Sequence, residues 1–156
     1  MNTITRNALV PYSAQRMFDL VADVDRYPQF LPWCGDAHIV EQTEGHQVAT
    51  VTIAFKGIRQ SFTTENTLES PTRIMLNLRD GPFTHLDGEW RFKILREDAC
   101  RIDFNLNYEM RSGLLAKVLG PLFGQIAQTM VDAFVKRAAA LADRKSTRLN
   151  SSHANI

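Results

Sequence analysis

Apolar and polar residues alternate over much of the chain, and this alternation predicts a protein built largely from β-strands. In residues 102–110, Ile102 and Phe104 alternate with Asp103 and Asn105, the pattern of an antiparallel strand with one buried face. Other runs are rich in Val, Ile, Thr and Phe and end at turn-forming Gly, Pro and Asp residues. We expect strands at residues 3–10, 38–44, 47–55, 60–68, 73–79, 84–95 and 100–110.

Two segments instead repeat apolar residues every three or four positions, which predicts amphipathic helices. The first covers residues 14–24, with Ser13 at the position of an N-cap. The second covers residues 112–141, and we expect a kink at residues 120–121 because the proline there has no backbone donor. Residues 27–33 are apolar but contain prolines, which predicts an irregular segment packed against the core.

The order of these elements predicts an α+β protein. A twisted antiparallel sheet with one apolar face has to cover that face, and the long C-terminal helix is large enough to do so. We therefore expect a seven-stranded curved sheet that wraps around this helix, with a short helical segment after the first strand. A gap between such a sheet and its helix favours an apolar ligand cavity. Gly88 is expected to mark a bulge or a strong bend.

Composition adds limits to this picture. The 156 residues correspond to about one domain, and a formal net charge of +1 gives no bulk electrostatic case for DNA binding. The chain has no run of about 18 apolar residues and no apolar N-terminal stretch, so we expect neither a membrane span nor a secretory signal. With two cysteines, we expect a reducing, cytoplasmic setting, with peripheral association at the inner membrane as a further option.

The last residues differ in character from the rest. Residues 143–156 contain Ser, Thr, Arg and Asn without a hydrophobic period, which predicts disorder. Residues 143–153 also resemble, codon for codon, the translation of a common sequencing-adapter oligonucleotide. We therefore expect residues 1–142 to form one domain and residues 143–156 to be a non-native tail that replaces the native C-terminus. Removing the three cations and one anion of this tail changes the formal charge from +1 to −1.

Residue types that carry chemistry in enzymes form no constellation in this sequence. Cys34 and Cys100 belong to no CxxC pair and to no cluster with zinc spacing, and we interpret them as buried fillers. We interpret His85, near Asp87, as a surface histidine, with a place at a cavity mouth as the alternative. The polar run around Glu65 either faces solvent or forms a polar spot within a pocket. Without a GxGxxG, P-loop, GxSxG or HExxH motif, we expect no enzyme, no metal and no cofactor.

Apolar side chains are the strongest functional signal. Aromatic residues on the strands and apolar residues on the last helix exceed what alternation requires, and Gly120, Pro121 and Gly124 leave space on the inner side of that helix. A filled core explains any one of these residues, whereas for the whole set we favour a ligand cavity. Leu114 and Val118 begin a face that would touch a membrane or form a lid. From this pattern, we expect ligand contacts from Phe55, Phe62, Trp90, Phe104, Leu115, Leu119 and Phe123.

Four stretches of the chain resemble one protein family. They are ALVPYSAQRMFDLVADVDRYPQFLPWCGDA, VTIAFKGIRQSFTTENTL, GPFTHLDGEWRFKIL and GLLAKVLGPLFGQIAQTMVDAFVKRA. The family is the coenzyme Q-binding family of START-like, helix-grip proteins, described in bacteria as the ribosome association toxin family. The resemblance covers residues 1–142, and YPQFLPWC is its most specific part. It implies that one loop forms the rim of the pocket, with the residues Tyr27, Pro28, Phe30, Leu31, Pro32 and Trp33.

The resemblance implies two functions. Our first hypothesis is binding of ubiquinone or a related polyprenyl lipid in the cavity, which supports respiratory electron transport without catalysis. The alternative is a regulator that binds the large ribosomal subunit and blocks its association with the small one. The net charge of −1 makes this the weaker physical case, since phosphate contacts dominate binding to RNA. A polyketide cyclase-type enzyme ranks last. Because the chain starts at its first strand, we expect the bacterial form, without a transit peptide.

Overall fold

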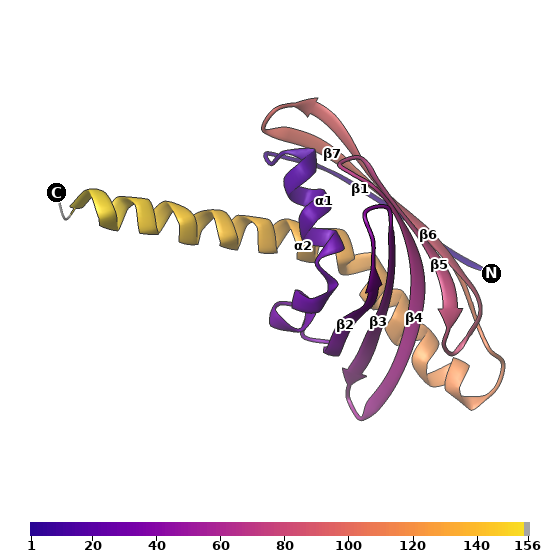
Figure 1. Cartoon of the computed structure of the whole chain (residues 1–156). Coiled ribbons are helices and arrows are strands. Elements are labelled where there is room, and N and C mark those ends of the chain that lie inside the picture. The colour runs from indigo at the N-terminus through magenta and orange to yellow at the C-terminus, as the bar shows by residue number, and fades with distance from the viewer. Residues whose placement is uncertain (155–156) are drawn as a thin grey trace.

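Seven antiparallel strands form a single curved sheet, and a long helix lies along one side of it (Figure 1). The strand order is β1-β7-β6-β5-β4-β3-β2, so that β2 to β7 form a meander and β1 pairs with β7. This arrangement confirms the predicted α+β helix-grip fold. The computed structural model describes the backbone of residues 1–154 and the side chains of residues 1–143. The strands are β1 (Asn2–Val10), β2 (Cys34–Gln42), β3 (His46–Phe55), β4 (Ile58–Glu69), β5 (Arg73–Asp80), β6 (Phe83–Arg96) and β7 (Ala99–Met110).

Two details of the sheet differ from the sequence prediction. Strand β2 begins at Cys34 rather than at residue 38. Register shifts after Cys34 and after Ile39 interrupt the alternation that marks a strand, and the sequence pattern therefore did not reveal its first residues. The bulge predicted at Gly88 is wrong, since its pairing with Leu76 and Leu106 continues without a shift. A side chain at Gly88 would lie 3.0 Å from the carbonyl oxygen of Asn105. The glycine is therefore explained by close packing of β6 on β7.

The segment between β1 and β2 forms two short helices. Helix α1 (Ala14–Ala22) begins at Ser13, whose Oγ accepts a hydrogen bond from the backbone N–H of Arg16 at 3.1 Å, as the N-cap prediction requires. Its buried side includes Met17 and Phe18, which pack into the core. The 3₁₀ helix η1 (Val24–Gln29) follows, in the apolar segment for which the sequence predicted irregular structure.

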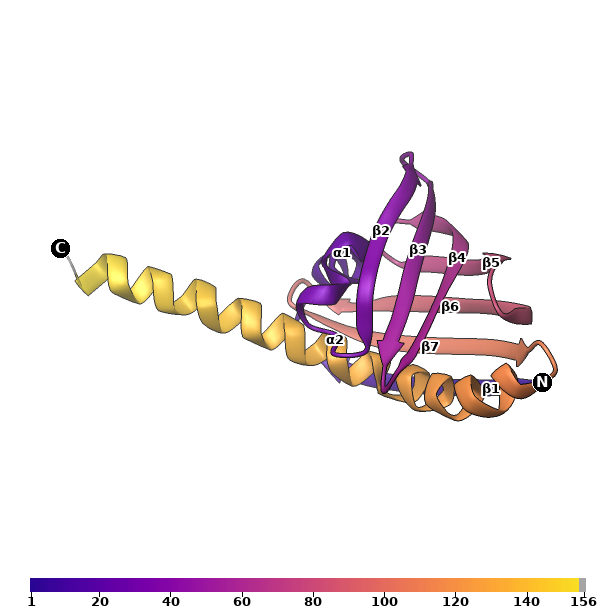
Figure 2. The same ribbon diagram turned by 90° about the horizontal axis from the view of Figure 1, so that it is seen from below.

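Helix α2 (Leu114–Ala154) covers the apolar side of the sheet. Figure 2 shows that it lies beside β1 and β7 and then extends beyond the sheet. By length and composition alone, the part from Leu114 to Asp143 could cross a membrane. Its inner side, however, is packed in the core as in a helix of a globular domain. The buried residues of this side are Leu119, Phe123, Ile126, Ala127, Val131, Phe134 and Ala138.

Helix α2 differs from the prediction at its C-terminal end. It continues to Ala154, whereas the sequence predicted disorder from residue 143. The helix also runs through Pro121 as one segment, and the kink expected at residues 120–121 stays a prediction. The predicted tail includes residues 155–156, which lie outside the described residues, and its non-native origin stays a prediction.

Candidate ligand-binding cavity

A cavity lies between the inner face of the sheet and α2, and apolar side chains form most of its wall. About 790 Å³ of empty space lies here, and this figure includes the part that is open to solvent. Strands β3 to β7, α1, η1 and α2 all contribute residues. The lining residues are Val21, Val24, Tyr27, Trp33, Gln47, Ala49, Val51, Ile53, Phe62, Thr64, Asn66, Ile74, Leu76, Leu86, Trp90, Phe104, Leu106, Phe123, Ile126, Ala127 and Met130.

Strand alternation explains why the cavity collects these side chains. Every second residue of a strand points to the same face, so Ala49, Val51 and Ile53 of β3 all reach the cavity. Their neighbours His46 and Thr50 point outward and are partly exposed. The same parity brings lining residues from the adjacent strands to this face, and the sheet curvature turns them toward α2.

Aromatic rings fix the wall at both ends. Trp90 lies against Phe104, with 4.4 Å between ring centroids, and its edge meets Phe134 of α2 at 5.4 Å. At the other end, Phe123 of α2 is 4.9 Å from Phe83 and 6.0 Å from Phe62, both in edge-to-face geometry. Contacts of this kind hold rings in defined orientations, so the cavity has preformed aromatic surfaces.

The structure also places a polar spot on the otherwise apolar wall. Thr64 Oγ1 donates to Asn66 Oδ1 at 2.8 Å, and Asn66 Nδ2 donates to Gln47 Oε1 at 2.9 Å. Gln47 Nε2 donates to the carbonyl oxygen of Ala22 at 2.8 Å and to Gln42 Oε1 at 3.0 Å. Both hydrogens of the Gln47 amide are therefore used, whereas the Asn66 amide keeps one hydrogen for a further acceptor.

This arrangement suits binding better than acid–base chemistry. Within residues 1–143, the lining of the cavity includes no carboxylate, imidazole or amine. Its titratable side chain is the phenol of Tyr27. Burial raises the pKa of Tyr27 far above its usual value, and its hydroxyl donates to the carbonyl oxygen of Val21. The phenol therefore acts as a fixed wall group. The described residues also contain no cluster of three or more His, Cys, Asp and Glu that could hold a metal ion.

The sequence-predicted site residues fall into three groups. Tyr27, Trp33, Phe62, Trp90, Phe104 and Phe123 line the cavity. Leu31 and Leu119 are buried in the core outside the lining, and Phe30 packs edge-on against Phe134 at 5.4 Å between centroids. Pro32, Phe55 and Leu115 are exposed. A direct role in ligand binding stays a prediction for all of these residues.

The polar residues of the cavity are the group that sequence reasoning missed. Thr64 and Asn66 have the same parity in β4 as Phe62 and therefore point inward, a signal that the alternation of this strand already contained. Glu65, which the sequence analysis considered for a polar spot, instead lies on the outer side. There it is 3.6 Å from Arg79 and 3.9 Å from His46.

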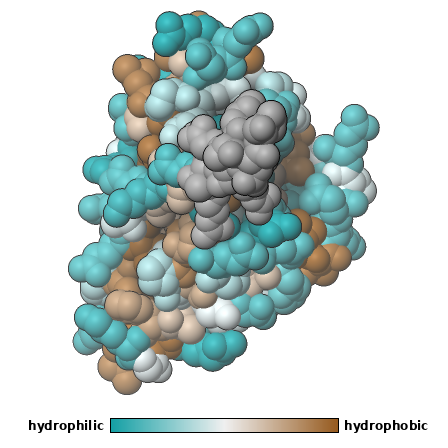
Figure 3. Space-filling view, turned by 90° about the vertical axis from the view of Figure 1, so that its left-hand side faces the viewer, coloured by the Kyte–Doolittle hydropathy of each residue, from teal (hydrophilic) through white to brown (hydrophobic). Residues whose placement is uncertain are grey.

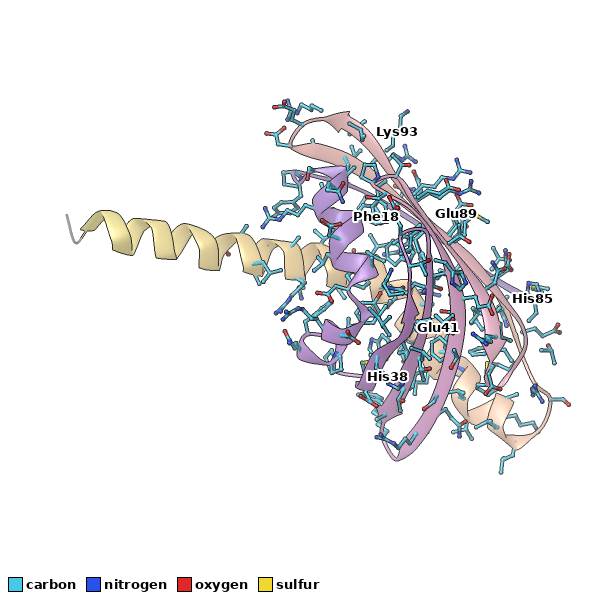
Figure 4. The ribbon with its side chains drawn as sticks, in the orientation of Figure 1. Phe18, His38, Glu41, His85, Glu89 and Lys93 are labelled. Carbon is cyan, nitrogen blue, oxygen red and sulfur yellow. The ribbon has the colours of Figure 1, made fainter. Side chains whose placement is uncertain are left out.

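The other candidate groups lie away from the cavity. Cys34 and Cys100 are buried free thiols, as predicted, and burial raises the pKa of Cys34 to about 11. His85 is an exposed residue whose Nε2 lies 2.6 Å from a carboxylate oxygen of Asp87. Figure 4 shows His85 on the outer side of the sheet, away from α2. It does not line the cavity, so the surface interpretation is the correct one.

Comparisons with known proteins agree with this architecture. The chain is similar to the Zhui aromatase/cyclase from Streptomyces, with a TM-score of 0.76 and 19% identity over 88% of this chain and 93% of that one. It is also similar to a START superfamily protein from Mycobacterium smegmatis, with a TM-score of 0.73 and 19% identity over 89% of this chain and 98% of that one. The fold and the apolar cavity thus define a START-like, helix-grip protein.

The sequence comparisons are more specific. Residues 10–135 match the family described as polyketide cyclase / dehydrase and lipid transport. The ribosome association toxin RatA of Pseudomonas aeruginosa is 49% identical over 88% of this chain and 96% of its own length. The RatA protein of Escherichia coli is 47% identical over 88% of this chain and 87% of its own length. The mitochondrial coenzyme Q-binding protein COQ10 homolog B of Xenopus laevis is 28% identical over 93% of this chain and 61% of its own length. The chain therefore belongs to the polyketide cyclase and lipid transport family, in the group that contains RatA and COQ10-like proteins.

Proposed function

We propose that this protein associates with the ribosome and blocks the joining of the large and small subunits. The observation that carries the proposal is the 49% identity to a protein named ribosome association toxin RatA, over 96% of the length of that protein. The COQ10-like relative is 28% identical. From the sequence alone, we prefer ubiquinone binding to ribosome association. The difference in identity supports the opposite preference.

Sucrose-gradient profiles of ribosomes test this proposal. Purified full-length protein is added to a bacterial lysate or to purified subunits at a magnesium concentration that favours joined ribosomes. We expect the peak of joined ribosomes to fall and both subunit peaks to rise with protein concentration, and the protein to migrate with the large subunit. Unchanged profiles at a large excess of folded protein would overturn the proposal.

A second candidate function is the binding of a hydrophobic ligand with a polar head group, such as ubiquinone or a related polyprenyl lipid. A specific observation favours it: the apolar cavity contains the amide of Asn66, which keeps one hydrogen for an acceptor. A carbonyl oxygen of a quinone head group is such an acceptor. Its ring would lie on the aromatic wall, and its apolar chain would lie along α2.

Organic extraction of the protein, purified without detergent, tests this second function. Mass spectrometry of the extract identifies the ligand and its molar ratio to protein. The variant for comparison is Ala127→Leu. Ala127 lines the cavity on α2, and a larger side chain there occupies ligand space. We expect a polyprenyl lipid at close to one per protein in the native chain and several-fold less in the variant. An empty extract from folded native protein would contradict this function.

The two functions can be separated with the same variant. If A127L loses the lipid and still lowers the peak of joined ribosomes, the ribosome activity does not need an occupied cavity. If both are lost while the variant remains folded, the ligand is required for the ribosome activity. Either result tells whether the cavity serves the ribosome function or a second role.

A further inference from the structure

One end of the molecule exposes several large apolar side chains. This apolar tip consists of Phe55, at the end of β3, and Leu114, Leu115 and Val118, in the first turns of α2. Their exposed fractions are 36%, 79%, 37% and 48%, respectively. In both Figure 1 and Figure 2, the turn between β3 and β4 lies at the same margin of the molecule as the start of α2. Figure 3 shows the opposite side of the molecule, where hydrophobic residues reach the surface at separate places among hydrophilic ones.

The backbone holds this tip in a defined shape. Lys56 and Gly57 have φ values of 50° and 81°, which suit the two-residue turn that closes a β-hairpin, and Phe55 pairs with Ile58 across it. Gly113, with a φ of 116°, redirects the chain between β7 and α2. The apolar residues are therefore presented by a hairpin turn and by a helix end.

Cations without carboxylate partners lie at this end. The cations here are Lys56, Arg59, Arg111 and Lys117, and within residues 1–143 none has a carboxylate oxygen within 4.0 Å. Between Glu109 and Asp132, the charged residues of the sequence are Arg111 and Lys117.

The outer face of the sheet is different, because its arginines are paired. Arg73 lies 3.2 Å from Glu89, and Arg101 lies 3.2 Å from Asp103. At the apolar tip, by contrast, cations without carboxylate partners lie beside exposed leucines.

We propose that the apolar tip docks on the surface of an anionic lipid bilayer. Exposed Leu and Phe side chains gain free energy by entering the boundary between head groups and acyl chains, and neighbouring Lys and Arg side chains bind anionic head groups. RNA would also attract the cations, but it offers no apolar environment to Leu114 and Val118. The combination of both features therefore favours a bilayer.

The tip also continues the side of the sheet that faces the cavity. Phe55 has the same parity in β3 as Val51 and Ile53, which line the cavity. Docking would therefore bring the cavity side of the molecule to the membrane, where a hydrophobic ligand is taken up or released. The docking itself requires neither a bound ligand nor ribosome association.

Vesicle flotation with the full-length chain tests the proposal. We expect binding to vesicles of phosphatidylcholine mixed with phosphatidylglycerol, and at least about tenfold weaker binding to phosphatidylcholine alone. The double variant L114D/V118D should lower binding to the mixed vesicles by at least about tenfold. The matched control is L9D, because Leu9 on β1 is a comparably exposed leucine, at 73%, and we expect it to bind like the native chain. Circular dichroism checks that each variant is folded.

Charge variants complete the test. We expect K56E/K117E to lose binding to the mixed vesicles, whereas K93E, which changes a lysine of β6, should retain it. Absence of binding by the native chain to mixed vesicles would overturn the proposal, and so would an equal loss in L9D. Binding that persists in L114D/V118D but is lost in K56E/K117E would assign the surface to a polyanion such as RNA instead. Neither ribosome profiles nor ligand extraction enter this test, so its failure is separate from failure of the proposed function.

Discussion

The space under the sheet has two halves that are built from the same elements but filled differently. In one half, α1 packs against β6, β7 and α2, and residues such as Phe18, Phe92 and Phe134 are almost completely buried with rings in contact. In the other half, the inner face of the sheet around β3 and β4 and the facing part of α2 leave the cavity between them, and α1 borders this cavity through Val21. Both halves have an apolar sheet face and an apolar stripe on α2. The two halves therefore differ in how completely side chains of α1 fill the space between the sheet and α2.

The polar residues follow the same division. In the described chain, the buried residues of polar type are Gln47, Thr52, Thr64 and Asn66, and three of them line the cavity. A polar group in the packed half would lose its hydrogen bonds to water at a large cost. In the cavity half, these side chains hydrogen bond to one another, and one amide hydrogen of Asn66 has no acceptor among the described residues. The second half thus collects hydrogen-bonded polar side chains, whereas the first half is packed with aromatic rings.

The largest expected effect is loss of packing in the filled half. Phe134→Ala removes a fully buried ring that contacts Tyr27, Phe30 and Trp90, and we expect it to lower the free energy of unfolding by about 3–5 kcal/mol. Urea denaturation followed by circular dichroism measures this change. Phe55→Ala, at an exposed position, is the control and should cost less than about 1 kcal/mol. Equal costs for the two variants would contradict the division into two halves.

A pair of alanines on α2 gives the next comparison. Ala127 lines the cavity and Ala138 is fully buried in the packed half. We expect Ala138→Leu to lower the free energy of unfolding by about 1–3 kcal/mol, because a filled core has no room for the added carbons. Ala127→Leu should change it by less than about 1 kcal/mol, because its side chain enters free space. Urea denaturation of both variants under identical conditions makes the measurement, and a larger cost for A127L would show that the cavity half is also filled.

Much of this fold could be predicted because alternation and helical periodicity report which face of an element is buried. The strand β7 and the helix α1, with its cap at Ser13, follow directly from such patterns. Periodicity does not report where the element that packs against a strand or helix ends. Phe55 and Leu115 therefore fit the apolar pattern of their own elements, although both are exposed outside the cavity. Register shifts hid the first residues of β2, since each shift changes the face to which the next residues point.

The cavity was predictable from the order of elements, but its polar group was not recognised. The polar run of β4 was interpreted through Glu65, which is the outward residue of that run. Its neighbours Thr64 and Asn66 face inward, where polar side chains are rare unless they are hydrogen bonded. Their partner Gln47 lies on another strand, and a single sequence does not tell that these three residues meet.

Replacing the polar group of the cavity should have a moderate effect on stability and a larger one on ligand content. Asn66→Leu leaves Gln47 Oε1 without its donor and Thr64 without its acceptor, and we expect a loss of about 1–3 kcal/mol in the free energy of unfolding. The amount of lipid extracted from the detergent-free protein should fall several-fold. The control is Asn77→Leu at an exposed position of β5. Lipid content equal to that of the native chain would show that Asn66 does not contact the head group.

The smallest expected effect compares the reactivity of the two thiols. Cys34 follows Trp33, which lines the cavity, whereas Cys100 is fully buried in the packed half. Burial raises the pKa of Cys34 from 9.0 to about 11, so the reactive thiolate is scarce at neutral pH and increases about tenfold per pH unit below that pKa. We expect labelling of Cys34 by iodoacetamide to be slow at neutral pH and to accelerate up to pH 10.

Cys100 should react more slowly still, because its exposure requires opening of the packed half. Mass spectrometry of Cys34→Ser and Cys100→Ser measures each thiol separately. Faster labelling of Cys100 in the native chain would show that the half covered by α1 opens more readily than the edge of the cavity.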